Sequence, residues 1–178
     1  MKIKVGIVSA EPSGDLLGSK ILNTLNEQFD EIEVVGIGGG ELLNWGVDAE
    51  RSLLKIMGLV DPLKNYSKIK NFQKQLIKNF TDEKIDVFIG IDSPDFNIGI
   101  HRALQMLGIK TIHVVCPSIW AWRAGRAKNF KFIDYMLCYS LLNQSCAATL
   151  RIPPCMLAIH YLIKNMSIKA KTKKILFA

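Results

Sequence analysis

Short apolar runs recur along this chain, and stretches with helical spacing lie between them. The runs are residues 2–9, 31–37, 85–91, 109–116 and 133–138. The helical stretches are residues 16–28, 41–45, 62–80, 97–107 and 124–130. Nearly continuous apolar strands are typical of a parallel sheet that helices cover on both faces. The pattern therefore predicts an α/β fold, a Rossmann-like doubly wound parallel sheet.

The loops that follow the strands are the candidate ligand sites, because doubly wound sheets bind ligands beyond the carboxyl ends of their strands. Three such loops draw attention, at residues 9–15, 92–97 and 117–126. The first loop contains one glycine and no G-x-G-x-x-G pattern, and the glycines after the second run have a different spacing. A nicotinamide enzyme is therefore disfavoured. The nucleoside triphosphate pattern G-x-x-x-x-G-K-[ST] is also absent from the sequence.

The first loop, Ala10-Glu11-Pro12-Ser13-Gly14-Asp15, opens a helix. Backbone N–H groups at a helix start attract anions, and Gly14 permits a close backbone approach. The alternative interpretation is a helix cap, in which Ser13 or Asp15 satisfies free N–H groups. The loop alone leaves both interpretations open.

The second loop places Asp92 directly after an apolar strand. A carboxylate there is partly desolvated, so its pKa can rise and it can serve as a general base. The alternative is an Asx turn before Pro94, with Asp95 capping the next helix. Both interpretations stay open for Asp92, whereas capping is the favoured one for Asp95.

The third loop carries Trp120 and Trp122, one residue apart, followed by Arg123 and Arg126. The tryptophans offer flat surfaces for sugar rings or acyl chains, and the arginines can hold a phosphate. The alternative is a hydrophobic plug with solvated charges. On the preceding strand, His113 is expected to be structural, because a lone strand histidine is more often a buried, satisfied residue than a catalyst.

Several features predict a cytoplasmic protein. The four cysteines form no C-x-x-C pair, which is typical of free thiols in a reducing compartment. The start of the chain does not match a signal peptide, and no apolar run approaches the roughly 18 residues that span a bilayer. The formal net charge of +7 favours phosphates, anionic lipids or nucleic acid without choosing among them.

Five motifs lie in these strands and loops: EPSGD at 11–15, MGL at 57–59, GIDSPDFN at 90–97, GIKTIH at 108–113 and WAWR at 120–123. Together they resemble the lipid-A-disaccharide synthase family, in order and at family-like spacing, over residues 3 to about 138. The resemblance implies the GT-B architecture of two Rossmann-like domains. Residues 1–138 would be its acceptor-side domain, the N-terminal half of the glycosyltransferase.

The resemblance also implies a reaction. The family joins UDP-2,3-diacylglucosamine to 2,3-diacylglucosamine 1-phosphate through a β-1,6 link and releases UDP, with no metal or other cofactor. Asp92 matches the carboxylate proposed as general base for the acceptor's 6-hydroxyl. The other matched residues would bind substrate: Glu11, Ser13, Gly14, Asp15, Asp95, Asn97, Trp120, Trp122, Arg123 and Arg126.

An apolar segment resembles the family's membrane-facing patch for acyl chains, and it consists of Ile56, Met57, Leu59 and Val60. Lysines nearby would favour anionic headgroups, by about 1 kcal/mol each close to the surface. The resemblance thus implies peripheral association with the inner membrane from the cytoplasm, and no nucleic-acid partner.

Residues 139–178 depart from the family, which would continue with motifs like LPFE and VGHPL. Codons compatible with YSLLNQSC at 139–146, read two bases later, give LPFEPEL, and the same shift over residues 156–166 gives VGHPLSDKEH. We therefore expect a frameshift at or just before Tyr139 and an aberrant, out-of-frame tail over residues 139–178. The UDP-sugar domain would then be absent. The alternative to the enzyme is a truncated, non-catalytic remnant that binds acyl-sugar phosphate or membrane only.

Overall fold

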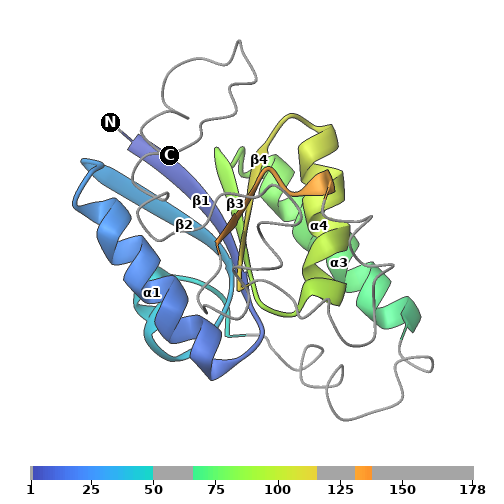
Figure 1. Cartoon of the computed structure of the whole chain (residues 1–178), viewed down its shortest axis with the longest axis horizontal. Helices are drawn as coiled ribbons and strands as arrows, with labels where there is room; N and C mark the ends of the chain where they lie inside the picture. The colour runs from blue at the N-terminus through green and yellow to red at the C-terminus, as the bar shows by residue number, and fades with distance from the viewer. Residues whose placement is uncertain (1, 50–65, 116–130, 138–178) are drawn as a thin grey trace.

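The computed structural model describes residues 2–49, 66–115 and 131–137 (Figure 1). One parallel sheet runs through them in the order β2-β1-β3-β4-β5. Its strands are β1 (Lys2–Ser9), β2 (Glu31–Ile37), β3 (Val87–Ile91), β4 (Lys110–Val114) and β5 (Tyr135–Leu137). The helices are α1 (Pro12–Asn26), the 3₁₀ helix η1 (Gly40–Trp45), α3 (Tyr66–Asp82) and α4 (Pro94–Met106). The predicted doubly wound α/β fold is confirmed.

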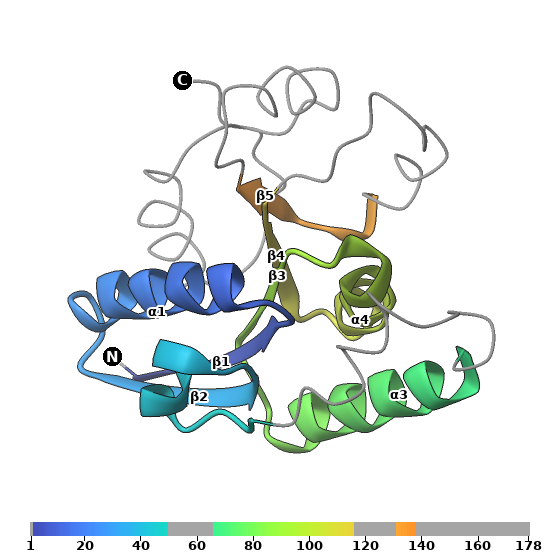
Figure 2. The same ribbon diagram turned by 90° about the horizontal axis from the view of Figure 1, so that it is seen from below.

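Helices cover both faces of the sheet. Figure 2 shows α1 on one side and α3 and α4 on the other. On the α1 side, Ile7 and Ile89 of the strands pack in one core with Leu22 of the helix. On the other side, Phe88 and Phe96 belong to a second core. Because both faces are buried, the strands have to be apolar almost throughout, as the sequence is.

The strand boundaries match the prediction more closely than the helix starts do. Residues 2–9 and 31–37 form strands at the predicted positions. Helices α1 and α4 begin at Pro12 and Pro94, several residues earlier than expected. Proline is well suited to the first helical turn, where its missing N–H leaves no hydrogen bond unmade, so these prolines start helices and do not merely mark turns. The helix predicted at 124–130 lies outside the described residues.

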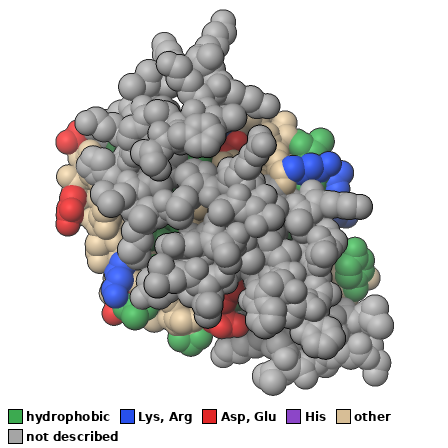
Figure 3. All heavy atoms as spheres, in the orientation of Figure 1, with side chains coloured by type: hydrophobic (Ala, Val, Ile, Leu, Met, Phe, Trp, Pro, Cys, Tyr) green, Lys and Arg blue, Asp and Glu red, His purple; other side chains and the backbone are tan. Residues whose placement is uncertain are grey.

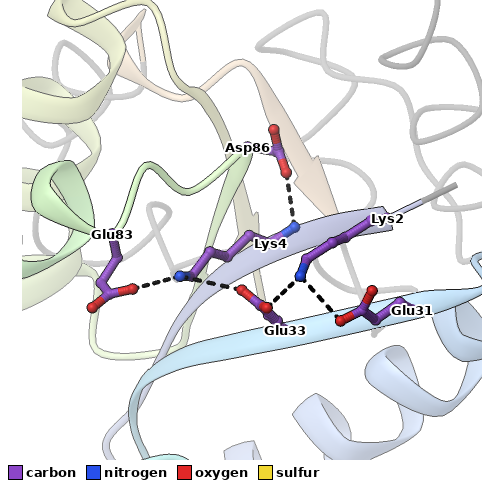
Figure 4. Close-up of polar contacts among 6 residues, drawn as sticks. All are labelled: Lys2, Lys4, Glu31, Glu33, Glu83 and Asp86. Carbon is purple, nitrogen blue, oxygen red and sulfur yellow. Dashed lines mark hydrogen bonds and ion pairs between the residues drawn. The ribbon is translucent and has the colours of Figure 1, made fainter.

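At the amino ends of the strands, ion pairs link β1 to its neighbours (Figure 4). The residues drawn there are Lys2, Lys4, Glu31, Glu33, Glu83 and Asp86. Glu33 lies 2.5 Å from the amine of Lys2 and 3.2 Å from that of Lys4, and hydrogen bonds from these two amines lower its pKa. The Asp86 carboxylate accepts a hydrogen bond of 2.8 Å from the backbone N–H of Lys4. Exposed ion pairs stabilise a fold only weakly, so we expect this cluster to contribute little to stability.

Candidate functional site

The strand order reverses direction between β1 and β3. From β1 the chain leaves through α1 on one face, whereas β3 leads into α4 on the other face. Such a switch point is where doubly wound sheets open a crevice for ligands. Ser9 pairs with Ile91 at the ends of the two strands, so the loops that begin at Ala10 and Asp92 leave the sheet next to each other. Two of the three predicted loops therefore meet at one place.

Both helices that leave this edge begin there, so both present backbone N–H groups and the positive end of a helix dipole. The N-cap of α1 is Glu11, whose backbone is extended and whose side chain makes no capping bond. The N-cap position is thus Glu11, and neither Ser13 nor Asp15 occupies it. Glu11 and Ser13 are exposed at the start of the helix, so a ligand bound at the switch point could reach them.

Asp15 and Gly14, by contrast, are buried in contact with the protein itself. An oxygen of Asp15 accepts a hydrogen bond of 3.2 Å from the backbone N–H of Gly39, which ties α1 to the loop after β2. A Cβ at Gly14 would lie 2.7 Å from the hydroxyl oxygen of Ser9 and 3.2 Å from a methyl group of Ile91. The close approach at Gly14 is thus between α1 and the sheet. Direct binding of substrate by either residue stays a prediction.

Asp92 is half-buried and has an unusual backbone. Its φ is 51°, and the next residue, Ser93, has a φ of 40°. Residues with side chains rarely adopt this left-handed conformation, and such strain persists where the surrounding structure holds it, often at functional sites. The backbone N–H of Asp92 donates to the carbonyl of Val114 at 2.9 Å. The prediction that Asp95 caps α4 is wrong, because the N-cap is Ser93 and Asp95 lies exposed in the first turn.

Asn97 lies behind the Asp92 loop and is fully buried. Its side-chain amide donates to the carbonyl of Asp92 at 2.8 Å and to the carbonyl of Ile91 at 3.3 Å. Gly90 makes room for it, since a Cβ at Gly90 would lie 3.0 Å from Cγ of Asn97. In the described residues its contacts are with the loop, so substrate binding by Asn97 stays a prediction.

One turn further along α4, His101 pairs with His113 of β4, and sequence reasoning missed this partner. Nε2 of His101 lies 3.1 Å from Nδ1 of His113, and both rings are buried. Burial lowers the pKa of His113 to about 4. Burial and then the nearby His113 lower the pKa of His101 well below its ordinary value. A neutral, buried pair supports the structural interpretation of His113. The sequence shows that His101 follows Asn97 by four residues, on the same helix face, but it does not show that His101 meets His113.

Two sets of predicted residues lie outside the described part of the chain. They are Trp120, Trp122, Arg123 and Arg126 of the third loop, and Ile56, Met57, Leu59 and Val60 of the apolar segment. The tail at 139–178 and the four cysteines lie outside it too. Within residues 2–49, 66–115 and 131–137, no group of three or more His, Cys, Asp or Glu side chains could hold a metal ion. None of the helices described there has both the length and the apolar character of a membrane span.

A polar groove of about 550 Å³ lies between α1 and η1. It is lined by Ser19, Asn23, Asn26, Glu41, Asn44 and Trp45. None of the predicted site residues lines this groove, so it is a separate feature from the switch point.

Comparisons with known sequences point to one family. The family model described as lipid-A-disaccharide synthetase matches residues 5–139. A lipid-A-disaccharide synthase of Burkholderia thailandensis is 44% identical over 140 residues, which cover 76% of this chain and 36% of that protein. A lipid-A-disaccharide synthase of Cellvibrio japonicus is 43% identical over 138 residues, with the same two coverages. The matched region therefore spans 36% of the length of these curated relatives.

Comparisons with solved structures concern the fold alone. The UDP-GlcNAc 2-epimerase from Neisseria meningitidis superimposes with a TM-score of 0.57 at 13% identity, over 86% of this chain and 44% of that one. The UDP-GlcNAc 2-epimerase from Methanocaldococcus jannaschii gives a TM-score of 0.54 at 11% identity, over 86% and 43%. The chain thus shares its fold with proteins of the GT-B type, as the motifs implied.

Proposed function

Because the chain belongs to the lipid-A-disaccharide synthetase family, we propose that residues 1–138 are the acceptor-side domain of a glycosyltransferase of lipid A synthesis. The reaction joins UDP-2,3-diacylglucosamine to 2,3-diacylglucosamine 1-phosphate and releases UDP. The observation that carries the chemistry is the position of Asp92. It is a half-buried carboxylate at the carboxyl end of β3, beside β1, where the strand order reverses.

In this proposal Asp92 is the general base. It takes the proton from the acceptor's 6-hydroxyl as that oxygen attacks the anomeric carbon of the donor from the face opposite UDP. The new bond joins the oxygen to the anomeric carbon while the bond from that carbon to the UDP phosphate oxygen breaks. UDP leaves with the bonding electrons, and the configuration at carbon is inverted.

The remaining residues would orient the acceptor. Glu11 and Ser13 are exposed on the α1 side of the switch point, and Asp95 is exposed on the α4 side. Positioning of this kind contributes a large part of the barrier reduction, on the order of 7–11 kcal/mol in well-oriented systems. Four residues of the third loop would add sugar, acyl and phosphate contacts: Trp120, Trp122, Arg123 and Arg126.

Membrane association belongs to the same proposal. The apolar segment would contact acyl chains at the cytoplasmic face of the inner membrane, through Ile56, Met57, Leu59 and Val60. On the first turns of α3, Lys68 is exposed and Lys70 is half-buried, so both can approach anionic headgroups. Each such lysine contributes about 1 kcal/mol near an anionic surface.

The second candidate is a non-catalytic remnant that binds acyl-sugar phosphate or membrane only. Two observations favour it. The family match ends at residue 139, and the matched region spans 36% of the relatives. This candidate would keep the acceptor side of the site without turnover, because transfer needs donor and acceptor aligned in one cleft.

The test is Asp92→Ala in a full-length version, in which the rest of a curated relative continues residues 1–138. We expect the variant to keep its fold and to lose transfer, measured as UDP release that requires both substrates. Asp82→Ala is the matched control, because Asp82 is an exposed aspartate at the end of α3. Near-normal turnover by Asp92→Ala would remove Asp92 from the mechanism.

A further inference from the structure

We propose that Asn97 is a positioning residue for Asp92, which it holds in a left-handed backbone conformation at the edge of the switch point. This inference rests on the proposed role of Asp92 as general base. It assigns Asn97 a role behind the reacting carboxylate, in place of direct contact with substrate.

The side-chain amide of Asn97 contacts the backbone on both sides of the Cα atom of Asp92. Its nitrogen donates to the carbonyl of Ile91, which precedes Asp92, and to the carbonyl of Asp92 itself. An amide nitrogen has two protons, so both donors are used. These two carbonyls lie on either side of the Cα atom of Asp92, and fixing both restrains its φ and ψ together. A third restraint is the hydrogen bond that the backbone N–H of Asp92 donates to the carbonyl of Val114.

The conformation that is held is uncommon, although aspartate adopts it more often than most residues with side chains do. Asp92 has a φ of 51° and Ser93 a φ of 40°, and left-handed residues with side chains are uncommon. A loop free of restraint would relax toward negative φ and carry the carboxylate to another place. The two hydrogen bonds from Asn97 oppose that relaxation directly.

The surroundings of Asn97 are shaped for this side chain. Asn97 is 0% exposed, and Gly90 opposite leaves space that a Cβ would fill, at 3.0 Å from Cγ and 3.1 Å from Cβ of Asn97. The amide oxygen of Asn97 has no hydrogen-bond partner among the residues that the structure describes. A buried oxygen left unpaired costs stability, so the donors on the nitrogen are the useful part of this amide.

The experiment uses the same full-length version with Asn97→Leu and Asn97→Asp. Leucine keeps a similar volume without donors, and aspartate keeps the shape but turns acceptor oxygens toward the two carbonyls. We expect kcat to fall on the order of 100-fold while KM for the acceptor stays within about twofold, because the loss is one of alignment. Asn79→Asp is the matched control, since Asn79 is exposed on α3.

A second readout needs no turnover. In the 178-residue chain, NMR reports the backbone of Asp92 through its carbon chemical shifts and coupling constants. We expect a positive φ in the unchanged chain and a negative φ in either Asn97 variant. If Asn97→Leu does not fold, Asn97→Asp decides; if neither folds, Asn97 is a structural residue and the inference fails.

The outcomes separate this inference from the proposed function. If Asp92→Ala is inactive while both Asn97 variants turn over normally, the positioning role is wrong and the general base stands. If Asp92→Ala is active, the proposed base is wrong, and with it the positioning role, whatever the backbone of Asp92 does. A positive φ at Asp92 in both Asn97 variants would overturn the positioning role of Asn97 and leave the proposed base untouched.

Discussion

Nε2 of His101 lies 3.1 Å from Nδ1 of His113, and the two buried rings meet edge to face between α4 and the sheet. A hydrogen bond between two ring nitrogens needs one protonated and one unprotonated nitrogen, which two neutral rings supply. A second charge would place N–H opposite N–H in a buried site. The contact thus excludes a charge on both rings at once, and burial favours the neutral form of each ring, which lowers both pKa values.

We predict that this pair makes the fold less stable as the pH falls from about 6.5 toward 4. The unfolded chain takes up protons on its histidines near 6.5, whereas folded His113 does so only near 4. Between these values the unfolded state binds more protons, so the contribution is complete above about 6.5 and is lost on acidification. His113 alone accounts for about 3 kcal/mol over this range. Urea unfolding between pH 4 and 7 measures it.

The control for this prediction is a double replacement, His101→Leu with His113→Val. It removes the two titrations and should flatten the pH dependence relative to the unchanged pair. The third histidine, His160, lies outside the described residues, so both proteins should carry His160→Gln. Equal slopes in the two proteins would show that the folded pair takes up protons over the same pH range as the unfolded chain, which would contradict the prediction.

The strands could be predicted from the sequence because a strand that is buried on both faces consists mainly of apolar residues. Lys2–Ser9 and Glu31–Ile37 are almost wholly apolar after their first residues, and polar loops bound them. Asp92 could be predicted as a site residue for a related reason, since it follows an apolar strand at the ligand edge.

Other parts of the site could not be predicted, because they depend on contacts between elements. No glycine marks the positive φ at Asp92 and Ser93, and aspartate, although enriched in this conformation, is too common elsewhere to predict it. The hydrogen bonds from Asn97 to the loop depend on α4 beginning at Pro94, whereas the spacing of apolar residues predicts a helix only from residue 97. The pairing of His101 with His113 depends on how α4 packs on β4, and single-sequence spacing does not show that.

We predict a large difference between two glycines that share a positive φ. Gly36 has a φ of 145°, and a Cβ there would lie 1.8 Å from the carbonyl oxygen of Ile7 in β1. Gly46 has a φ of 80° and no atom within 4 Å of such a Cβ. Gly46→Ala should cost about 1–2 kcal/mol for its backbone alone. Gly36→Ala should cost more than about 4 kcal/mol or prevent folding, because backbone atoms of paired strands cannot move apart cheaply.

Urea unfolding of the two glycine variants measures this difference, with the unchanged chain as reference. Similar losses in both variants would contradict the close approach of β2 to β1 at Gly36. At Gly36 the requirement for glycine comes from strand pairing.

We predict that the 178-residue polypeptide by itself shows no transfer. The matched region spans 36% of its curated relatives, and the proposed reaction needs donor and acceptor aligned in one cleft. The measurement is UDP release with both substrates at saturating concentration, beside a full-length relative as positive control. Release that depends on both substrates would contradict the prediction and favour an enzyme whose catalytic groups all lie in this polypeptide.

The last prediction concerns residues 139–178, for which the codon reading gives two family motifs in one shifted frame. The coding DNA after codon 138 tests the frameshift directly. When it is read two bases later, it should encode LPFE and VGHPL in one continuous reading frame.

At the protein level, out-of-frame residues would never have been selected to pack on the sheet. We therefore expect limited proteolysis to remove them and to leave a resistant core that ends near Cys138, as mass spectrometry would show. A tail that resists protease as well as the core does would contradict the frameshift, and the reappearance of the two motifs would then be a coincidence of codon degeneracy.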